Sequence, residues 1–286
     1  SHENKLRVGR REPFPCCQDF TQYLRHGKDP RFKIAPLTFA RPERDCIPLK
    51  INRETNYSKD KNIWHLSHEG LDLEDPANEP KYNEPGFLEL GVSPEQAPDK
   101  PEYVTVSFEK GEPVAVNGQK LDAVSIVKTL NEIGGRNGVG IVDMVENRLV
   151  GMKCRGVYEN PAGTLLYKLH RDLEGICLDR ELLGIRDMLA VRYAQCVYNG
   201  FWYSPEREAM QAFMDKSQET VTGTVRAKLY KGGVWPLART SPNSLFSEDL
   251  ATFEGGDYDH KDAAGFIRLN SLRLRLHAAV QSKLGK

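Results

Sequence analysis

Residues 102–118 read EYVTVSFEKGEPVAVNG, and this stretch decides the kind of fold that the chain can form. Polar and apolar side chains alternate over 103–108, and the chain turns at Lys110-Gly111 before the alternation resumes. A period of two is typical of a half-buried strand. A glycine-containing turn between two such runs is typical of a β-hairpin. The stretch therefore predicts an antiparallel hairpin.

The residues after this hairpin change to a helical pattern. Asp122 is placed to cap a helix that ends at Gly134-Gly135, and the apolar residues between them follow helical spacing, at 123, 126, 127, 130 and 133. A long helical region is predicted over 164–198, with a break near Gly184, and another helix from Pro205 to about Thr220.

A second hairpin closes this part of the chain. Residues 222–230 alternate again, and the turn at 231–233 leads into the apolar run VWPL. Residues 71–101, which hold six prolines and many acidic residues, predict an ordered loop or a linker. Antiparallel hairpins beside grouped helices indicate an α+β fold.

The two ends of the chain differ from this central part. Residues 1–57 are predicted to be an irregular arm, because six prolines interrupt any long helix and basic residues exceed acidic ones there. Residues 58–269 form the predicted α+β domain, and 270–286 a C-terminal helix. Its apolar residues recur every four positions, which by spacing alone favours burial in the chain's own core over docking on another subunit; they are Leu272, Leu276, Val280 and Leu284.

Composition excludes several classes of function. The 286 residues carry a formal net charge of zero, which gives no electrostatic basis for binding nucleic acid. No apolar run approaches the length of a membrane span. Six cysteines at 16, 17, 46, 154, 177 and 196 are too sparse for a disulfide scaffold, and no spacing fits a metal site. We expect free thiols and a cytoplasmic protein, with an organelle matrix as the alternative compartment.

Residues 137–167, NGVGIVDMVENRLVGMKCRGVYENPAGTLLY, hold the main candidate site. The charges do not repeat every three to four residues, so an exposed helix face explains them poorly. The carboxylates of Glu146 and Glu159, the guanidinium of Arg155 and the phenol of Tyr158 are the groups that can bind a zwitterion. A structural salt-bridge cluster at a strand edge is the equally favoured alternative.

Residues 57–70, YSKDKNIWHLSHEG, are the second candidate. Ser58 and Ser67 supply hydroxyls, and Asn62 and His65 lie between them in the sequence. A serine beside a histidine raises the possibility of a nucleophile, but no GxSxG elbow supports it. The hydroxyls are better interpreted as hydrogen-bond donors to a ligand, or as helix caps. Neither GxxxxGK[ST] nor GxGxxG occurs in the chain, so it has no familiar phosphate-binding loop.

Four phrases resemble the C-terminal, synthetase half of argininosuccinate synthase: NIWHLSHEGLDLEDPANEP at 62–80, GGRNGVGIVDMVENRLVGMKCRGVYENPAGTLL at 134–166, VYNGFWYSPEREAMQAFMDKSQETVTGTV at 197–225 and KDAAGFIRLNSLRLRL at 261–276. The likeness runs from about Ser58 to the C-terminus. That family joins citrulline to aspartate using ATP, through a citrulline adenylate, and releases AMP and pyrophosphate. Its enzymes are homotetramers whose C-terminal helix reaches onto neighbouring subunits. The resemblance therefore implies that 270–286 is an oligomerisation helix, which reverses the expectation from spacing.

Carried over position by position, the resemblance implies citrulline contacts at Ser58, Ser67, Glu146 and Tyr158. Two departures are mild: the usual KSRG reads KCRG at 153–156, and the usual YETP reads YENP. A larger departure is the missing SGGxDTS motif with which the family wraps the ATP pyrophosphate. We thus expect the citrulline-binding and oligomerising half of such a ligase, with no cofactor bound by this chain and no ligase activity without an ATP-binding half. The alternative is a catalytically silent, enzyme-derived structural subunit of a larger protein assembly, such as one in an organelle.

Overall fold

The computed structural model describes residues 57–251 and 259–285. The chain divides into two compact units, Ser1–Lys50 and Ile51–Lys286, and every described residue lies in the second. The predicted basic arm therefore lies outside the described residues, apart from Tyr57.

The predicted hairpin at 102–118 is confirmed. Strands β2 (Glu102–Glu109) and β3 (Glu112–Val116) pair antiparallel, and the two turn residues adopt left-handed backbone angles, with φ of 50° at Lys110 and 82° at Gly111. Every second side chain of β2 is buried because successive side chains point to opposite faces of a strand.

The second hairpin is also confirmed and completes a five-stranded sheet. Strands β7 (Gly223–Tyr230) and β8 (Gly233–Thr240) pair with each other, and β7 pairs with β2 over its whole length. The short strand β4 (Gln119–Lys120) pairs with β3, which gives the order β4-β3-β2-β7-β8 with every pair antiparallel. This arrangement confirms the α+β class.

Helix α2 (Ala123–Arg136) begins as predicted, because the Asp122 carboxylate accepts hydrogen bonds from the amides of Val124 (3.0 Å) and Ser125 (3.1 Å). Its predicted end at Gly134-Gly135 is wrong, since both glycines lie inside the last turn. A Cβ on Gly135 would lie 2.0 Å from the Leu90 carbonyl oxygen, so this glycine serves a close backbone approach.

Three further helices follow: α3 (Pro161–Cys177), α4 (Arg180–Tyr198) and α5 (Pro205–Gln218). The helix predicted from Pro205 is confirmed. The predicted break near Gly184 is wrong, because Gly184 lies within α4 and the interruption falls at Leu178 and Asp179. The Asp179 side chain accepts hydrogen bonds from the amides of Glu181 and Leu182 and so caps the start of a new helix.

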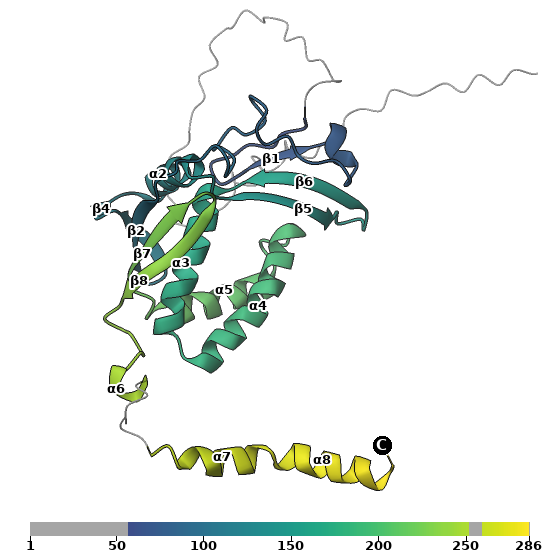
Figure 1. Ribbon diagram of the computed structural model, residues 1–286, viewed down its shortest axis with the longest axis vertical. Helices are drawn as coiled ribbons and strands as arrows, with labels where there is room; N and C mark the ends of the chain where they lie inside the picture. The colour runs from purple at the N-terminus through teal and green to yellow at the C-terminus, as the bar shows by residue number, and fades with distance from the viewer. Residues whose placement is uncertain (1–56, 252–258, 286) are drawn as a thin grey trace, which may run out of the picture. The chain divides into compact units, whose positions relative to one another are not determined.

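The main core lies where α2 and α3 cover one face of the five-stranded sheet (Figure 1). It takes alternate residues from the strands and one face from each helix. Its fully buried members include Val104, Phe108, Leu130, Leu169 and Leu229. The core thus joins residues that are far apart in the sequence.

A second, three-stranded sheet carries the residues of functional interest. Its order is β1-β6-β5, with β1 at Leu66–Glu69, β5 at Ile141–Asn147 and β6 at Lys153–Glu159, all antiparallel. One face packs on a small core of Leu73, Phe87 and Val157. The predicted loop at 71–101 begins with a 3₁₀ helix, η1 (Leu71–Glu74), and supplies two of these three residues.

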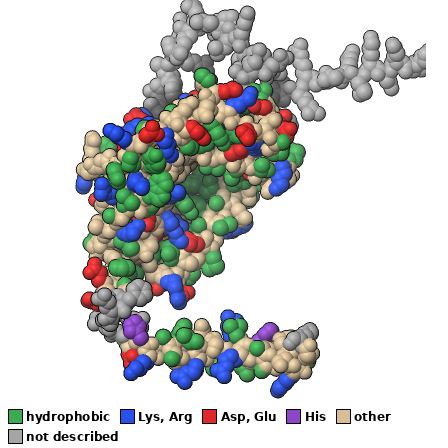
Figure 2. Space-filling model, in the orientation of Figure 1, with side chains coloured by type: hydrophobic (Ala, Val, Ile, Leu, Met, Phe, Trp, Pro, Cys, Tyr) green, Lys and Arg blue, Asp and Glu red, His purple; other side chains and the backbone are tan. Residues whose placement is uncertain are grey.

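The C-terminal helices are α6 (Glu248–Ala251), α7 (Asp262–Asn270) and α8 (Leu272–Lys283), which confirms a helical C-terminus. Spacing alone favoured burial of its apolar residues, and that expectation is wrong for the described part of the chain. The exposed fractions are 47% for Leu272, 67% for Leu276, 54% for Val280 and 65% for Leu284. Figure 2 shows apolar side chains at the surface of these helices.

Within 57–251 and 259–285, none of the helices has the length and apolar character that crossing a bilayer requires. Cys154, Cys177 and Cys196 are free thiols, and the other three cysteines lie outside the described residues.

Candidate functional site

The main candidate stretch forms a β-hairpin of strands β5 and β6. Its turn is closed by hydrogen bonds from the amide of Arg148 to the Met152 carbonyl (2.8 Å) and from the amide of Gly151 to the Arg148 carbonyl (2.7 Å). Gly151 has a φ of 87°, a conformation that favours glycine. The charges of this stretch thus alternate between two faces of a sheet rather than following a helix.

Strand register places all four predicted contact residues on the same face. Side chains directly opposite each other on paired strands share a face, and every second residue along a strand returns to it. Ser67 lies opposite Tyr158, Glu146 opposite Cys154, and Ser58 opposite Glu69 through an isolated bridge. Because Glu69 is itself opposite Gly156, these pairs form one surface, which we call the front face: Ser58, Ser67, Glu69, Glu146, Cys154 and Tyr158.

Tyr158 and Glu146 are in direct contact on the front face. The Tyr158 hydroxyl donates a hydrogen bond to Glu146 Oε1. Partial burial, followed by the neighbouring Glu146 carboxylate, raises the pKa of Tyr158 well above its usual range. The phenol therefore stays protonated and neutral at any physiological pH.

Gly156 provides the space in which the Tyr158 ring lies. A Cβ at this position would be 2.9 Å from Cε2 of the ring, so the ring covers the strand two residues earlier. A side chain at residue 156 would push the phenol away from Glu146. The group that approaches this glycine is thus the neighbouring phenol.

The two serines differ in their surroundings. Ser67 is 3% exposed, and its Oγ accepts a hydrogen bond from the Asp60 amide at 3.2 Å, which leaves the hydroxyl proton free to donate. Ser58 is exposed, and its hydroxyl has no hydrogen-bond partner among the described residues, although its backbone pairs in both directions with Glu69 (2.8 and 2.9 Å).

The residues between the two serines form a turn. The Asn62 side-chain oxygen accepts the amides of Trp64 (2.8 Å) and His65 (3.0 Å), so this side chain stabilises the turn. The His65 ring lies 6.2 Å from the Tyr158 ring, measured between centroids. No nucleophilic Ser-His pair is present in this segment as described, because neither serine hydroxyl contacts the imidazole.

Glu69 is a front-face residue that the sequence analysis missed. Its side chain is 30% exposed, and its nearest cation, Arg148, stands 3.9 Å away. Glu69 also contributes to the raised pKa of Tyr158, after burial and Glu146. Its position two residues after Ser67 was the available signal, since period two places both on one face once the segment is known to be a strand.

Arg155 and Glu159, which the zwitterion hypothesis included, lie on the opposite face and serve structure. Arg155 is 8% exposed and forms a two-point pair with Asp143 (2.9 and 2.7 Å). It also donates to the backbone carbonyls of Asp75 (3.1 Å) and Asn78 (2.9 Å). Its N–H donors bond to the Asp143 carboxylate on β5 and to two carbonyls of the 71–101 loop, so this guanidinium does not belong to the front face.

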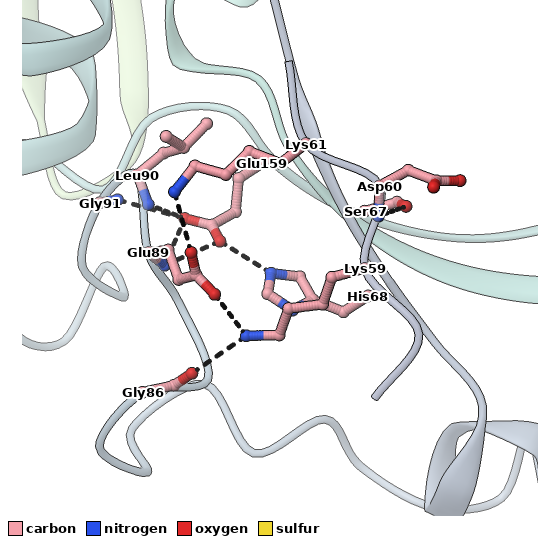
Figure 3. A network of polar contacts seen from close by, with 10 residues as sticks. All are labelled: Lys59, Asp60, Lys61, Ser67, His68, Gly86, Glu89, Leu90, Gly91 and Glu159. Carbon is pink, nitrogen blue, oxygen red and sulfur yellow. Dashed lines mark hydrogen bonds and ion pairs between the residues drawn. The ribbon is translucent and has the colours of Figure 1, made fainter. Parts of the chain in front are cut away.

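Glu159 is 1% exposed and holds the loop that precedes β2 (Figure 3). Its carboxylate accepts hydrogen bonds from the amides of Glu89 (2.9 and 3.1 Å), Leu90 (2.7 Å) and Gly91 (3.2 Å). His68 Nε2 donates to it at 2.8 Å. The structural-cluster hypothesis is thus confirmed for Arg155 and Glu159, and the ligand-site hypothesis stays a prediction for the residues of the front face.

The part of the chain that the structure describes contains no group of three or more His, Cys, Asp or Glu side chains suited to hold a metal ion. The front-face residues offer two carboxylates, two serine hydroxyls, a thiol and a neutral phenol, and the exposed side chains of Val142 and Met144 lie on the same side of the sheet. This set suits a small polar ligand that carries a cationic group.

Comparison with known proteins identifies the family. Residues 57–277 match the family model described as "Arginosuccinate synthase C-terminal domain". The chain belongs to the argininosuccinate synthase family. It is 57% identical over 251 residues to an argininosuccinate synthase of Clostridium botulinum (strain Alaska E43 / Type E3), covering 87% of this chain and 61% of that protein.

Two other argininosuccinate synthases show the same extent of similarity. The protein of Oleidesulfovibrio alaskensis is 59% identical over 248 residues, which cover 86% of this chain and 61% of the relative. The protein of Moorella thermoacetica is 57% identical over 240 residues, which cover 84% and 58%. The chain therefore spans about three fifths of the length of these relatives. The matched residues include the entire front face.

Proposed function

We propose that this chain provides the citrulline-binding part of an argininosuccinate synthase, with the front face as the binding surface. The observation that supports this most strongly is the convergence of Ser58, Ser67, Glu146 and Tyr158 on one sheet face, from segments about 90 residues apart in sequence. The resemblance assigned citrulline contacts to these four residues. Independently of the resemblance, the strand register puts the same four residues on one face of the sheet.

Each front-face group has a role that fits the two charged ends and the ureido group of citrulline. The carboxylates of Glu69 and Glu146 attract the ammonium group. The Ser67 hydroxyl, whose oxygen already accepts the Asp60 amide, donates its proton to a carboxylate or ureido oxygen. Tyr158 remains a neutral phenol, so it orients the ligand by hydrogen bonding without adding charge.

In the proposed reaction the ureido oxygen of citrulline attacks the α-phosphorus of ATP, and pyrophosphate leaves. The amine of aspartate then attacks the ureido carbon, and AMP leaves. The residues of this chain bind and orient citrulline for both steps, which lowers the barrier by fixing the position of the attacking oxygen. Because the sequence contains no recognised phosphate-binding loop, ATP is bound by residues outside this chain.

Calorimetry of citrulline binding to the full chain tests the proposal. We expect measurable binding to the parent chain and its loss in Glu146→Ala and in Tyr158→Phe. Glu219→Gln is the matched control, because Glu219 pairs with Lys216 in an exposed region and lies outside the front face. Absence of binding to the parent chain would refute the proposal and favour a structural subunit. Pyrophosphate release on adding ATP, citrulline and aspartate to the chain alone would refute the assignment of ATP to other residues.

We also propose that α7 and α8 dock on other copies of this chain. Their large apolar side chains are exposed, including Phe266 (68%), Leu269 (71%) and Leu276 (67%). Such a row on a terminal helix needs a covering surface. Light scattering after size-exclusion chromatography is the test: deletion of residues 259–286 should reduce a tetramer to a smaller species. A parent chain that is already monomeric would contradict the proposal.

A further inference from the structure

Glu89 connects the buried face of the three-stranded sheet to the segment that carries Ser58. Its backbone amide donates to both oxygens of Glu159, at 2.9 and 3.1 Å. Its side-chain carboxylate accepts from Lys59 Nζ (2.7 Å) and from Lys61 Nζ (3.0 Å) (Figure 3). One residue thus uses its main chain for the sheet and its side chain for the neighbouring segment.

The Ser58 segment has few other attachments. Residues 58–61 form no strand of their own and pair with β1 only through isolated bridges, Ser58 to Glu69 and Lys61 to Leu66, together with the backbone contact between Asp60 and Ser67. Lys59 Nζ also donates to the Gly86 carbonyl at 3.2 Å, so this lysine holds the 86–91 loop at two points. These side-chain contacts add to the backbone pairing and link the segment to the 86–91 loop.

The alternation of the segment explains how these contacts reach the front face. Successive side chains of an extended chain point to opposite sides. Figure 3 shows Lys59 and Lys61 turned toward Glu89, while Asp60 points the other way. With the lysine side chains on one side of the segment, the Ser58 side chain lies on the other.

The electrostatics favour a permanent contact. Hydrogen bonds from Lys59 and then Lys61 hold the pKa of Glu89 down to about 2, so its carboxylate is ionised at neutral pH. The side chains are partly shielded from water, with 33% of Glu89 and 26% of Lys59 exposed. The other end of the connection is fully buried at Glu159.

We propose that Glu89 is a positioning residue for the citrulline site: it places Ser58 relative to Tyr158 by tying Lys59 and Lys61 to the Glu159 anchor. Glu89 touches none of the front-face side chains and acts only through the lysines. The expected effect on citrulline affinity rests on the proposed function. The expected effect on the order of the Ser58 segment rests on the structure alone.

The experiment compares Glu89→Gln, Lys59→Met and the double variant in the full chain at neutral pH. Citrulline affinity is measured by calorimetry, and hydrogen exchange is measured at the amides of Ser58 and Glu69, which bond to each other's carbonyls. We expect citrulline to bind about three- to tenfold more weakly to Glu89→Gln, with faster exchange at both amides. Because both substitutions remove the Lys59–Glu89 contact, their effects in the double variant should sum to less than the two single effects.

Two further variants separate positioning from general damage. Glu89→Asp keeps the charge and should recover part of the affinity, which a misfolded loop would not allow. Glu219→Gln breaks an exposed Lys–Glu pair of 2.6 Å elsewhere and should change neither readout.

Unchanged affinity and unchanged exchange in Glu89→Gln would overturn the inference, as would fully additive effects of the two substitutions. If the parent chain binds no citrulline, the proposed function fails by itself. The exchange of the Ser58 and Glu69 amides then decides the positioning role alone: faster exchange supports it, and unchanged exchange rejects it.

Discussion

Replacing Glu159 by glutamine should destabilise the protein without touching the ligand surface. The Glu159 carboxylate is buried and accepts three successive backbone amides and one imidazole N–H. Glutamine keeps the shape and one oxygen but removes the negative charge. Hydrogen bonds to a charged group contribute about 1.5–3 kcal/mol, against about 1 kcal/mol for a neutral pair.

The magnitude follows from the three amides. If each of the three hydrogen bonds weakens by about 1 kcal/mol when the charge is removed, the total loss is about 3 kcal/mol. Part of this loss is offset, because burying a neutral amide costs less free energy than burying a carboxylate. His68 reduces the loss at the other oxygen. Its Nδ1 is buried and has no hydrogen-bond partner among the described residues, so the ring proton can move to Nδ1 and Nε2 can accept from the new amide. We expect a net loss of about 2–3 kcal/mol, a large part of the roughly 5–15 kcal/mol by which proteins are stable.

The assay is urea unfolding followed by tryptophan fluorescence, with Glu146→Gln as the control on the opposite face of the same sheet. Glutamine at 146 still accepts the Tyr158 hydroxyl, so stability should change by less than about 1 kcal/mol while citrulline affinity falls. A loss below about 1 kcal/mol in Glu159→Gln, or equal losses in both variants, would refute the division of the sheet into a structural and a ligand face.

Three other outcomes are expected. Gly156→Ala should weaken citrulline binding about tenfold in calorimetry, because its Cβ would displace the Tyr158 ring, and unchanged binding would contradict this. Asp122→Ala removes the cap of α2 and should lower the free energy of unfolding by about 1 kcal/mol in urea titrations; no change would show that the cap is dispensable. The pKa of Glu89 is depressed from 4.5 to about 2, so its stabilising contribution is complete above pH 4.5 and is lost as the pH falls toward 2. The stability difference between the parent and Glu89→Gln should accordingly be constant from pH 7 to 5 and shrink below pH 4.5, and a difference that shrinks already above pH 5 would rule out this origin.

Local patterns predicted the elements whose signals are local. Alternation over 103–108 and the turn at Lys110-Gly111 predicted the first hairpin, and Asp122 predicted the start of α2. Gly134 and Gly135 misled the prediction of the helix end, because each makes room for a segment distant in the sequence. Gly135 lies within a helix to admit the Leu90 backbone, and that contact joins residues 45 positions apart.

The candidate site shows the same limit. The residue types of the 137–167 stretch predicted a ligand site or a salt-bridge cluster, and the structure confirms the cluster for Arg155 and Glu159. Which residue served which purpose depended on the strand register: Glu146 and Glu159 lie 13 residues apart and face opposite sides. Glu69 was missed because its place on the face of Ser67 and Tyr158 follows only once the segment is known to be a strand paired with β6.

The sequence by itself determined the family, the α+β class, the two hairpins and the four residues expected to bind citrulline. Each of these depends on residue identity or on spacing within one segment. Only the tertiary structure decided that Arg155 and Glu159 are structural, that Glu69 joins the front face, and that the apolar C-terminal helices are left exposed by the described residues. The physical reason is that burial and hydrogen-bond partners come from segments distant in the chain, and a strand reveals its two faces only when its neighbours are in register.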